Sequence, residues 1–317
     1  MATPLDDLLG ELCSCTELPV GSSLHNLSNL EAAGVASLRA AWSQISTEVR
    51  RHMMTRLVEM AEADFEMDFG GVFRLGLTDE DPEVRLAAIE GLWEDEDVRL
   101  VPALIDRLTS EQASEVRAAA ATSLGRFILL GELDKIRPKP YQLAYTALLH
   151  TCQSQDESLE VRRRAMESLS YVCDDQVIGL IESAFGASEE RMRVSAVFAM
   201  GRSNDRRWSR HVQGELFNPN PELRYEAARA CGELQLTDAV VDLEELTEDV
   251  DAEVQEATLW ALGQIGGAKA RQILLRFADS DSEATRSAAE AALNELEFLH
   301  GDLDELFDRL MDASLDF

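Results

Sequence analysis

The chain has 317 residues, of which 60 are Asp or Glu and 29 are Lys or Arg, so its formal net charge at pH 7 is -31. So acidic a chain argues against a nucleic-acid-binding protein, which needs a basic footprint for phosphates, and against binding to anionic membranes. Apolar residues make up 45% of the chain, which argues against a disordered protein.

The N-terminal segment, residues 1–30, is predicted to be partly loop, because Ser and Asn recur through residues 18–29. It lacks the basic region and long apolar run of a signal peptide. No stretch of the chain approaches the roughly 18 uncharged apolar residues that span a membrane. Cys13 and Cys15 form a lone pair without the second half of a zinc site. We therefore expect a cytoplasmic protein.

Residues 31–300 contain a repeating pattern that can be followed by one position. This position is Arg in every copy but one, where Gln replaces it, and its last five occurrences are 31 residues apart. The seven anchor residues are Arg85, Arg117, Arg162, Arg193, Arg224, Gln255 and Arg286. Such a constant step is the mark of a repeat architecture.

Each repeat is predicted to be a helical hairpin. The residues one before, three after and seven after the anchor are mostly apolar or small, and these positions lie on one face of a helix. A second, less regular helix precedes each of these helices; examples are residues 98–108, 177–184, 239–246 and 270–277. One hairpin cannot bury its own apolar stripe, whereas stacked hairpins can.

The turn before the anchor carries a further motif, in which an Asp is followed five residues later by Val-Arg or Val-Gln. The motif occurs as Asp79 with Val84-Arg85, Asp156 with Val161-Arg162 and Asp249 with Val254-Gln255. It resembles the HEAT repeat, especially the short bacterial kind also found in phycobilisome-lyase-like proteins. The resemblance covers roughly residues 70–300. It implies an all-α, armadillo-type fold: a right-handed α-solenoid (superhelix) of about seven to eight HEAT-type helical hairpins.

The resemblance also implies a ladder along the stack, in which Asp and Arg of adjacent repeats pair. Four residues depart from this pattern, and we expect the ladder to be broken at each of them. They are Glu111, Ala187, Asn218 and Gln255.

The array is irregular in three places. Residues 43–60 look like a degenerate repeat, and an insertion near residues 127–140 is interpreted as a lengthened helix plus a loop, with or without a role in contacts. Residues 301–317 are predicted to be an acidic C-terminal capping helix or tail. Its apolar residues at helical spacing are Leu303, Leu306, Phe307, Leu310 and Met311. This helix either closes the stack or docks in a groove of a partner.

No catalytic or metal-binding motif is present. The five histidines are scattered, and none stands beside a glutamate, as the paired His-Glu motifs of the HEAT-like deoxyhypusine hydroxylases would require. A phosphate-binding glycine loop and a nucleophile elbow are also missing. We expect a protein that is not an enzyme and has no metal and no cofactor.

Two sets of residues are candidates for binding. The first set lies on the second helices, on the side opposite the apolar stripe, which commonly lines the concave face of a solenoid. Its members are Trp93, Arg163, Phe198, Tyr225, Arg229 and Trp260. The alternative is that these rings pack as ordinary core between repeats.

The second set is the only dense basic stretch of the chain and could clamp a carboxylate or an acidic peptide. Its members are Arg202, Arg206, Arg207, Trp208 and Arg210. The alternative is that these arginines neutralise nearby glutamates. By contrast, residues 233–256 carry ten acids and no Lys or Arg, which indicates a solvated face or a dock for a basic partner.

We predict a non-catalytic scaffold, adaptor or assembly factor that binds another protein, one with a basic surface, and neither nucleic acid nor membrane. The alternative is a bilin-lyase-like enzyme or chaperone that attaches a chromophore. A chromophore role predicts visible absorbance after co-expression with bilin, whereas a scaffold predicts a specific protein partner.

Overall fold

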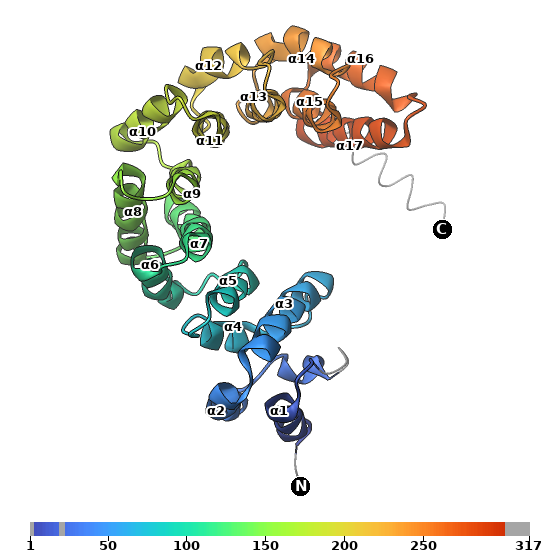
Figure 1. Ribbon diagram of the computed structural model, residues 1–317. Helices are drawn as coiled ribbons and strands as arrows, with labels where there is room; N and C mark the ends of the chain where they lie inside the picture. Colours follow the sequence, from blue (N-terminus) through green and yellow to red (C-terminus); the bar gives the residue numbers. More distant parts are fainter. Residues whose placement is uncertain (1–2, 19–22, 302–317) are drawn as a thin grey trace. The chain divides into compact units, whose positions relative to one another are not determined.

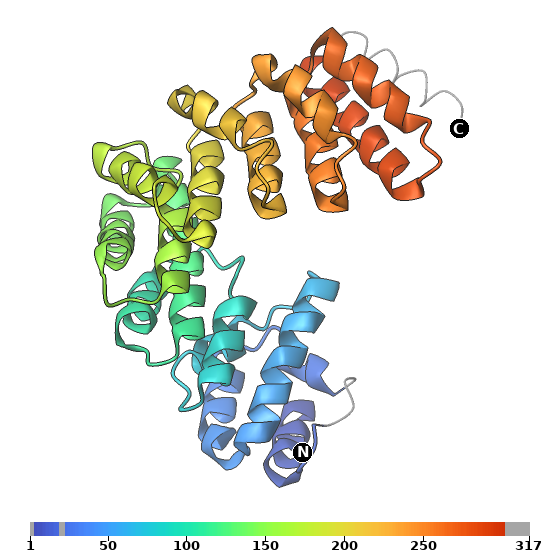
Figure 2. The same ribbon diagram turned by 45° about the horizontal axis from the view of Figure 1, so that its top comes forward.

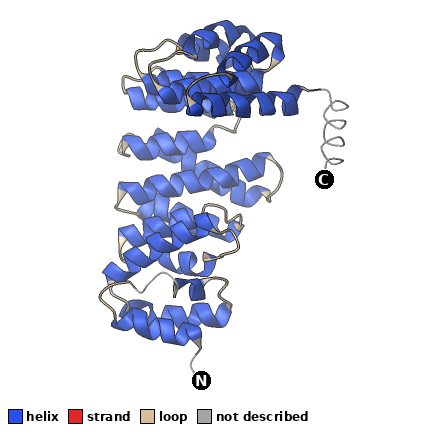
Figure 3. Ribbon diagram, turned by 90° about the vertical axis from the view of Figure 1, so that its right-hand side faces the viewer, coloured by secondary structure: helices blue, strands red, loops and turns tan. Residues whose placement is uncertain are grey.

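A computed structural model describes residues 3–18 and 23–301, and within these residues it contains helices and no strand (Figures 1 and 3). Contacts divide the chain into unit 1, Met1–Ser168, and unit 2, Leu169–Phe317. The helices of unit 1 are α1 Pro4–Ser14, α2 Ala32–Ala41, α3 Thr47–Ala63, α4 Gly70–Gly76, α5 Pro82–Gly91, α6 Val101–Ser110, α7 Ser114–Glu132, α8 Pro138–Gln153 and α9 Leu159–Leu169, which ends one residue past the boundary. The helices of unit 2 are α10 Asp175–Phe185, α11 Glu190–Arg202, α12 Ser209–Gly214, α13 Pro221–Glu233, α14 Val240–Leu246, α15 Ala252–Ile265, α16 Gly267–Ala278 and α17 Glu283–His300.

Both units are stacks of helical hairpins, so the all-α solenoid fold is confirmed. In unit 2 the second helices α11, α13, α15 and α17 pack against one another in order, and each also packs against the first helix of its own hairpin (Figures 1 and 2). In unit 1 the helices α3, α5 and α7 form the same kind of row. The C-terminal helix predicted for residues 301–317 lies almost entirely outside the described residues, which end at Gly301.

The turn between the two helices of a hairpin is fixed by side chains that cap the second helix. Asp81 accepts hydrogen bonds from the backbone N–H groups of Glu83 and Val84, and Asp251 does the same for Glu253 and Val254. These bonds satisfy N–H groups that have no partner within the helix. The residue that follows the end of the second helix also recurs every 31 residues. Asn204, Gln235 and Gly266 occupy this position, and all have a positive φ, between 50° and 69°.

The apolar stripe of the second helices forms the core. Val84, Ala88 and Leu92 are buried in unit 1, and so are Met192, Ala196 and Met200 in unit 2. The stripe weakens only in the last described hairpin, where Thr285 and Leu293 of α17 are half-buried because no further repeat covers them among the described residues.

The two irregular regions are also helical. The insertion near residues 127–140 consists of the end of a long α7, a loop and the start of α8, and the Tyr141 hydroxyl donates a hydrogen bond of 2.6 Å to Glu132 across the loop. In the degenerate repeat, α3 carries Arg50 at the anchor position, where it pairs with Asp79 at 3.2 Å. The N-terminal segment contains α1 and a short 3-10 helix at Leu24–Leu27.

Several anchor arginines connect one repeat to the next. Arg85 donates a hydrogen bond to the backbone carbonyl of Asp79, six residues earlier. It also forms a bidentate ion pair with Glu111 of the next repeat, with N–O distances of 2.6 and 2.7 Å. Arg224 makes the same bond to the carbonyl of Asn218 and grips Asp249 with two bonds of 2.7 Å. Such bidentate ion pairs fix the orientation of the two side chains as well as the distance between them.

The expected breaks in this ladder are only partly correct. The break predicted at Glu111 is wrong, because the glutamate reaches Arg85. At Asn218 the ladder shifts by three residues instead of breaking, since Arg193 pairs with Glu215 at 3.0 Å and Asn218 donates to the same carboxylate. Gln255 does lose the ionic bond but keeps the bond to the carbonyl six residues earlier, that of Asp249, at 2.6 Å.

We predict that Asp249→Asn destabilises the protein in a pH-dependent way. The hydrogen bonds from Arg224 hold the pKa of Asp249 below its usual value, so the ionised form stabilises the fold. This stability is present above the pKa of about 3.9 expected for an unfolded aspartate and is lost as the pH falls through the lower pKa of the folded state. The variant should lose about 2 kcal/mol at pH 7.

The measurement is urea unfolding of the full chain, followed by circular dichroism at pH 7 and near pH 3. The difference between variant and wild type should shrink at the lower pH. Asp238→Asn removes the same charge from an exposed residue and should change stability little. An equal loss at both pH values would contradict the linkage to this ion pair.

Candidate protein-binding surface

Three neighbouring second helices of unit 2 carry four of the predicted binding residues. Phe198 lies on α11, Tyr225 and Arg229 lie on α13, and Trp260 lies on α15. All four side chains are half-buried. Each ring therefore packs partly between repeats and leaves part of its surface to solvent.

Two arginine–aromatic pairs lie on these helices: Arg229 of α13 with Trp260 of α15, and Arg202 with Phe198, both on α11. The guanidinium carbon of Arg229 lies 3.7 Å from the centroid of the Trp260 ring, and that of Arg202 lies 5.4 Å from the centroid of the Phe198 ring. A cation over an aromatic face is attracted by the electron density of the ring. The stacking also holds the long arginine side chains in place.

A glutamate lies between the two pairs. Glu233 of α13 forms an ion pair with Arg202, in which the Arg202 Nε and the Glu233 Oε1 are 3.3 Å apart. Burial raises the pKa of Glu233, while the charges of Arg202 and Arg229 act in the opposite direction. We call Phe198, Arg202, Arg229, Glu233 and Trp260 the α11–α15 cluster.

Glycines bring these helices together. Gly201, Gly232 and Gly263 stand at the same position of α11, α13 and α15, 31 residues apart. A Cβ added to Gly232 would lie 2.7 Å from the Trp260 ring and 2.9 Å from the Ala261 Cα, and one added to Gly201 would lie 2.8 Å from the Ala230 Cα. Only a residue without a side chain allows this approach. Sequence analysis missed this column and Glu233, although the 31-residue step marks the glycines.

The second predicted set does not converge on one site. Trp208 is only 1% exposed, so its ring belongs to the core and cannot contact a ligand at the surface. The physical reason is that α12 itself offers only Val212 to the core, and the ring supplies the missing apolar area. Arg202 belongs to the α11–α15 cluster instead.

The remaining arginines of that stretch lie at the surface. Arg207 pairs with Asp205 at 2.6 Å, Arg206 donates to the carbonyl of Gln235 at 3.3 Å, and Arg210 is exposed. An anion site formed by these three residues stays a prediction.

The two candidates from unit 1 have different surroundings. Arg163 on α9 pairs with Glu160 at 2.7 Å and with Glu167 at 3.6 Å, so its charge is balanced within its own helix. Trp93 follows α5 and is 60% exposed.

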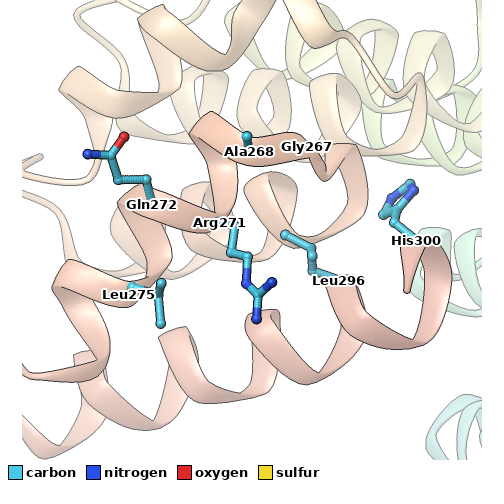
Figure 4. Close-up of a pocket in the computed structure, with 7 residues that line it drawn as sticks. All are labelled: Gly267, Ala268, Arg271, Gln272, Leu275, Leu296 and His300. Carbon is cyan, nitrogen blue, oxygen red and sulfur yellow. The ribbon is translucent and has the colours of Figure 1, made fainter. Parts of the chain in front are cut away.

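A cavity of about 620 Å³ lies between α16 and α17 (Figure 4). Arg271, Gln272 and Leu275 contribute to it from α16, and Leu296 and His300 contribute from α17. Two of its polar groups already have partners: Arg271 pairs with Glu297 at 3.2 Å, and the His300 ring nitrogen lies 2.9 Å from the Gln264 carbonyl oxygen.

A family model for HEAT repeats matches residues 72–138 and 215–294. These two segments carry HEAT repeats. The matched segments include Trp93, Tyr225, Arg229 and Trp260, whereas Phe198 and Arg202 lie outside them. No curated protein matches the sequence.

Solved structures with similar folds are other solenoids. The Kap95:Nup1 complex matches with a TM-score of 0.52 at 13% identity, over 95% of this chain and 47% of that one. Importin beta matches with a TM-score of 0.51 at 15% identity, over 92% and 44%. This chain thus spans less than half the length of either, and the likeness shows the fold alone. The CpcE–CpcF complex of phycocyanin lyase from Nostoc sp. PCC7120 matches with a TM-score of 0.45 at 17% identity, over 62% of this chain and 76% of that one. This score is too low to support any inference.

The described residues include potential metal ligands and two buried thiols. Among residues 3–18 and 23–301, no group of three or more His, Cys, Asp and Glu could hold a metal ion. Burial raises the pKa of Cys152 and of Cys231 to about 12, so both thiols stay protonated. None of the described helices is long and apolar enough to cross a membrane.

We predict that Gly232→Ala destabilises the HEAT array by about 1 to 3 kcal/mol, because the new methyl group has to push α13 and α15 apart. Thermal unfolding followed by circular dichroism measures the loss. Gly179→Ala is the matched control, since Gly179 lies within α10 and an added Cβ there meets nothing within 4 Å. This control should be neutral or slightly stabilising, as alanine is the better helix former. Equal behaviour of the two variants would show that the close approach does not matter.

Proposed function

We propose that the chain is a non-catalytic scaffold, adaptor or assembly factor that holds another protein on the second-helix face of unit 2. The observation that carries the proposal is the α11–α15 cluster, in which arginines are held on half-exposed aromatic rings. Trp, Tyr and Arg are the residue types that dominate the energy of protein interfaces. Rings and guanidiniums that are already held in place lose little freedom on binding, which favours affinity.

The partner is proposed to carry basic residues close to its contact surface. The chain has a net charge of -31, and residues 233–256, which begin with Glu233 of the cluster and include α14, carry ten acids and no Lys or Arg. Complementary charge speeds association and rejects acidic competitors. The same charge disfavours nucleic acid and anionic membranes as partners. Kap95, whose fold is similar, has a structure that is a complex with Nup1.

The test is an affinity pull-down from the native cell extract, comparing wild type with Phe198→Ala/Tyr225→Ala/Trp260→Ala. We expect one protein to be enriched by wild type and to be lost or reduced about tenfold or more with the variant, since removing three interface rings costs several times 1 kcal/mol. Circular dichroism verifies that the variant keeps its helicity.

The matched control removes two exposed apolar side chains of unit 2 that lie outside the second helices, in Phe217→Ala/Val241→Ala. It should retain the partner. If the triple variant still retains the partner, this surface is excluded as the binding site. A wild-type protein that retains no partner, but acquires visible absorbance after co-expression with bilin, would favour the lyase-like alternative.

A further inference from the structure

Unit 1 has a pocket of about 460 Å³ that the proposed function does not use. Three segments form it: the loop between α3 and α4, the start of α4, and the turn after α5. Phe65 and Trp93 line it, together with the carboxylates of Asp68, Glu94 and Glu96. We call it the α3–α5 pocket.

The two rings are unusually open to solvent. Phe65 is 94% exposed and Trp93 is 60% exposed, which places both among the most exposed large apolar residues of the described chain. Single exposed apolar residues are common, but two aromatic rings that line one hollow form an apolar surface available to a partner. The shape and the rings indicate a binding site, and the surrounding charges indicate its occupant.

The pocket is strongly negative. Four carboxylates line it, and the only guanidinium among its lining residues, that of Arg74, pairs with Asp95 and with Asp97. Asp68 accepts a hydrogen bond of 2.7 Å from the Gly70 N–H. Glu94 and Glu96 are exposed.

The neighbouring helices do not cancel this charge. Two further cations lie near the pocket acids: Arg99, which pairs with Asp97, and Arg126 on α7. Burial lowers the pKa of Arg126, while Asp95, Glu96 and Glu94 act in the opposite direction. Glu62 on α3 and Glu90 on α5 add negative charge, and the pKa of Glu90 is raised by burial and by Glu62. Carboxylates therefore still outnumber guanidiniums.

We propose that the α3–α5 pocket binds a cationic side chain, arginine or lysine, from a basic segment of a partner protein. The stem and the charge of that side chain lie against the faces of Trp93 and Phe65, where cation–π attraction acts. Glu94 and Glu96 supply the charge-assisted hydrogen bonds that this cation needs when it leaves water. The site uses residues of unit 1 alone, so this proposal can be tested independently of the α11–α15 cluster.

The probe is a fluorescein-labelled peptide of alternating glycine and arginine, titrated with the purified full chain and followed by fluorescence anisotropy. The comparison peptides have lysine, citrulline or glutamate in place of arginine. We expect the arginine and lysine peptides to bind, with an affinity that falls as salt is raised, and the neutral citrulline and the acidic peptides to bind at least about tenfold more weakly.

Two variants of the pocket separate its parts. Phe65→Ala/Trp93→Ala should weaken binding of the arginine peptide about tenfold. Glu94→Gln/Glu96→Gln should weaken it by a similar factor and reduce its dependence on salt. All four residues lie in or beside surface loops, and circular dichroism verifies the fold.

The matched control, Glu31→Gln/Glu80→Gln, removes two exposed carboxylates of unit 1 that do not line the pocket, and should leave affinity within about twofold. The Phe198→Ala/Tyr225→Ala/Trp260→Ala variant should also keep its affinity. The proposal is overturned if no cationic peptide binds, if removing both rings leaves affinity unchanged, or if the control variants weaken binding as much as the pocket variants do.

Discussion

A helical hairpin leaves the apolar stripe of its second helix exposed, so each repeat has to be covered by the next one. The rest of the structure depends on this contact. The buried columns bring successive second helices together, and the anchor arginines fix their register: Arg85 grips Glu111, and Arg224 grips Asp249. Each of these arginines lies between two turns, where a carboxylate balances its charge and a backbone carbonyl accepts a further hydrogen bond. A buried cation requires such partners.

The sequence was sufficient for the architecture, because columns spaced by 31 residues report directly which face of each helix is covered. It was less reliable for the ladder. The expected break at Glu111 assumed that only Asp fits, yet a glutamate side chain is one methylene longer and reaches the same guanidinium. At Asn218 the carboxylate comes from Glu215, one turn earlier along the chain. The physical requirement is a carboxylate within reach of the arginine, and a fixed position in a motif is only one way to meet it.

The candidate binding residues of unit 2 could be assigned to second helices from the sequence, but their contacts could not. The position of Trp208 in a basic stretch suggested a surface role, whereas its side-chain direction is set by a short 3-10 turn that leaves no periodic signal in the sequence. The pairing of Arg229 with Trp260 depends on the distance between α13 and α15. That distance follows from Gly232, whose meaning emerges only when the neighbouring helix is in place.

The same close approach supports the proposed binding role. Where glycine lets two helices meet, the half-buried side chains beside the contact turn partly outward, and those of adjacent repeats come into contact there. Arg202 and Glu233 meet in this way, as do Arg229 and Trp260. The contacts stiffen a surface whose residues do not form the core. Under the proposed function, substitution in these outward columns changes what is bound, while the buried columns, the glycines and the ladder continue to specify the fold.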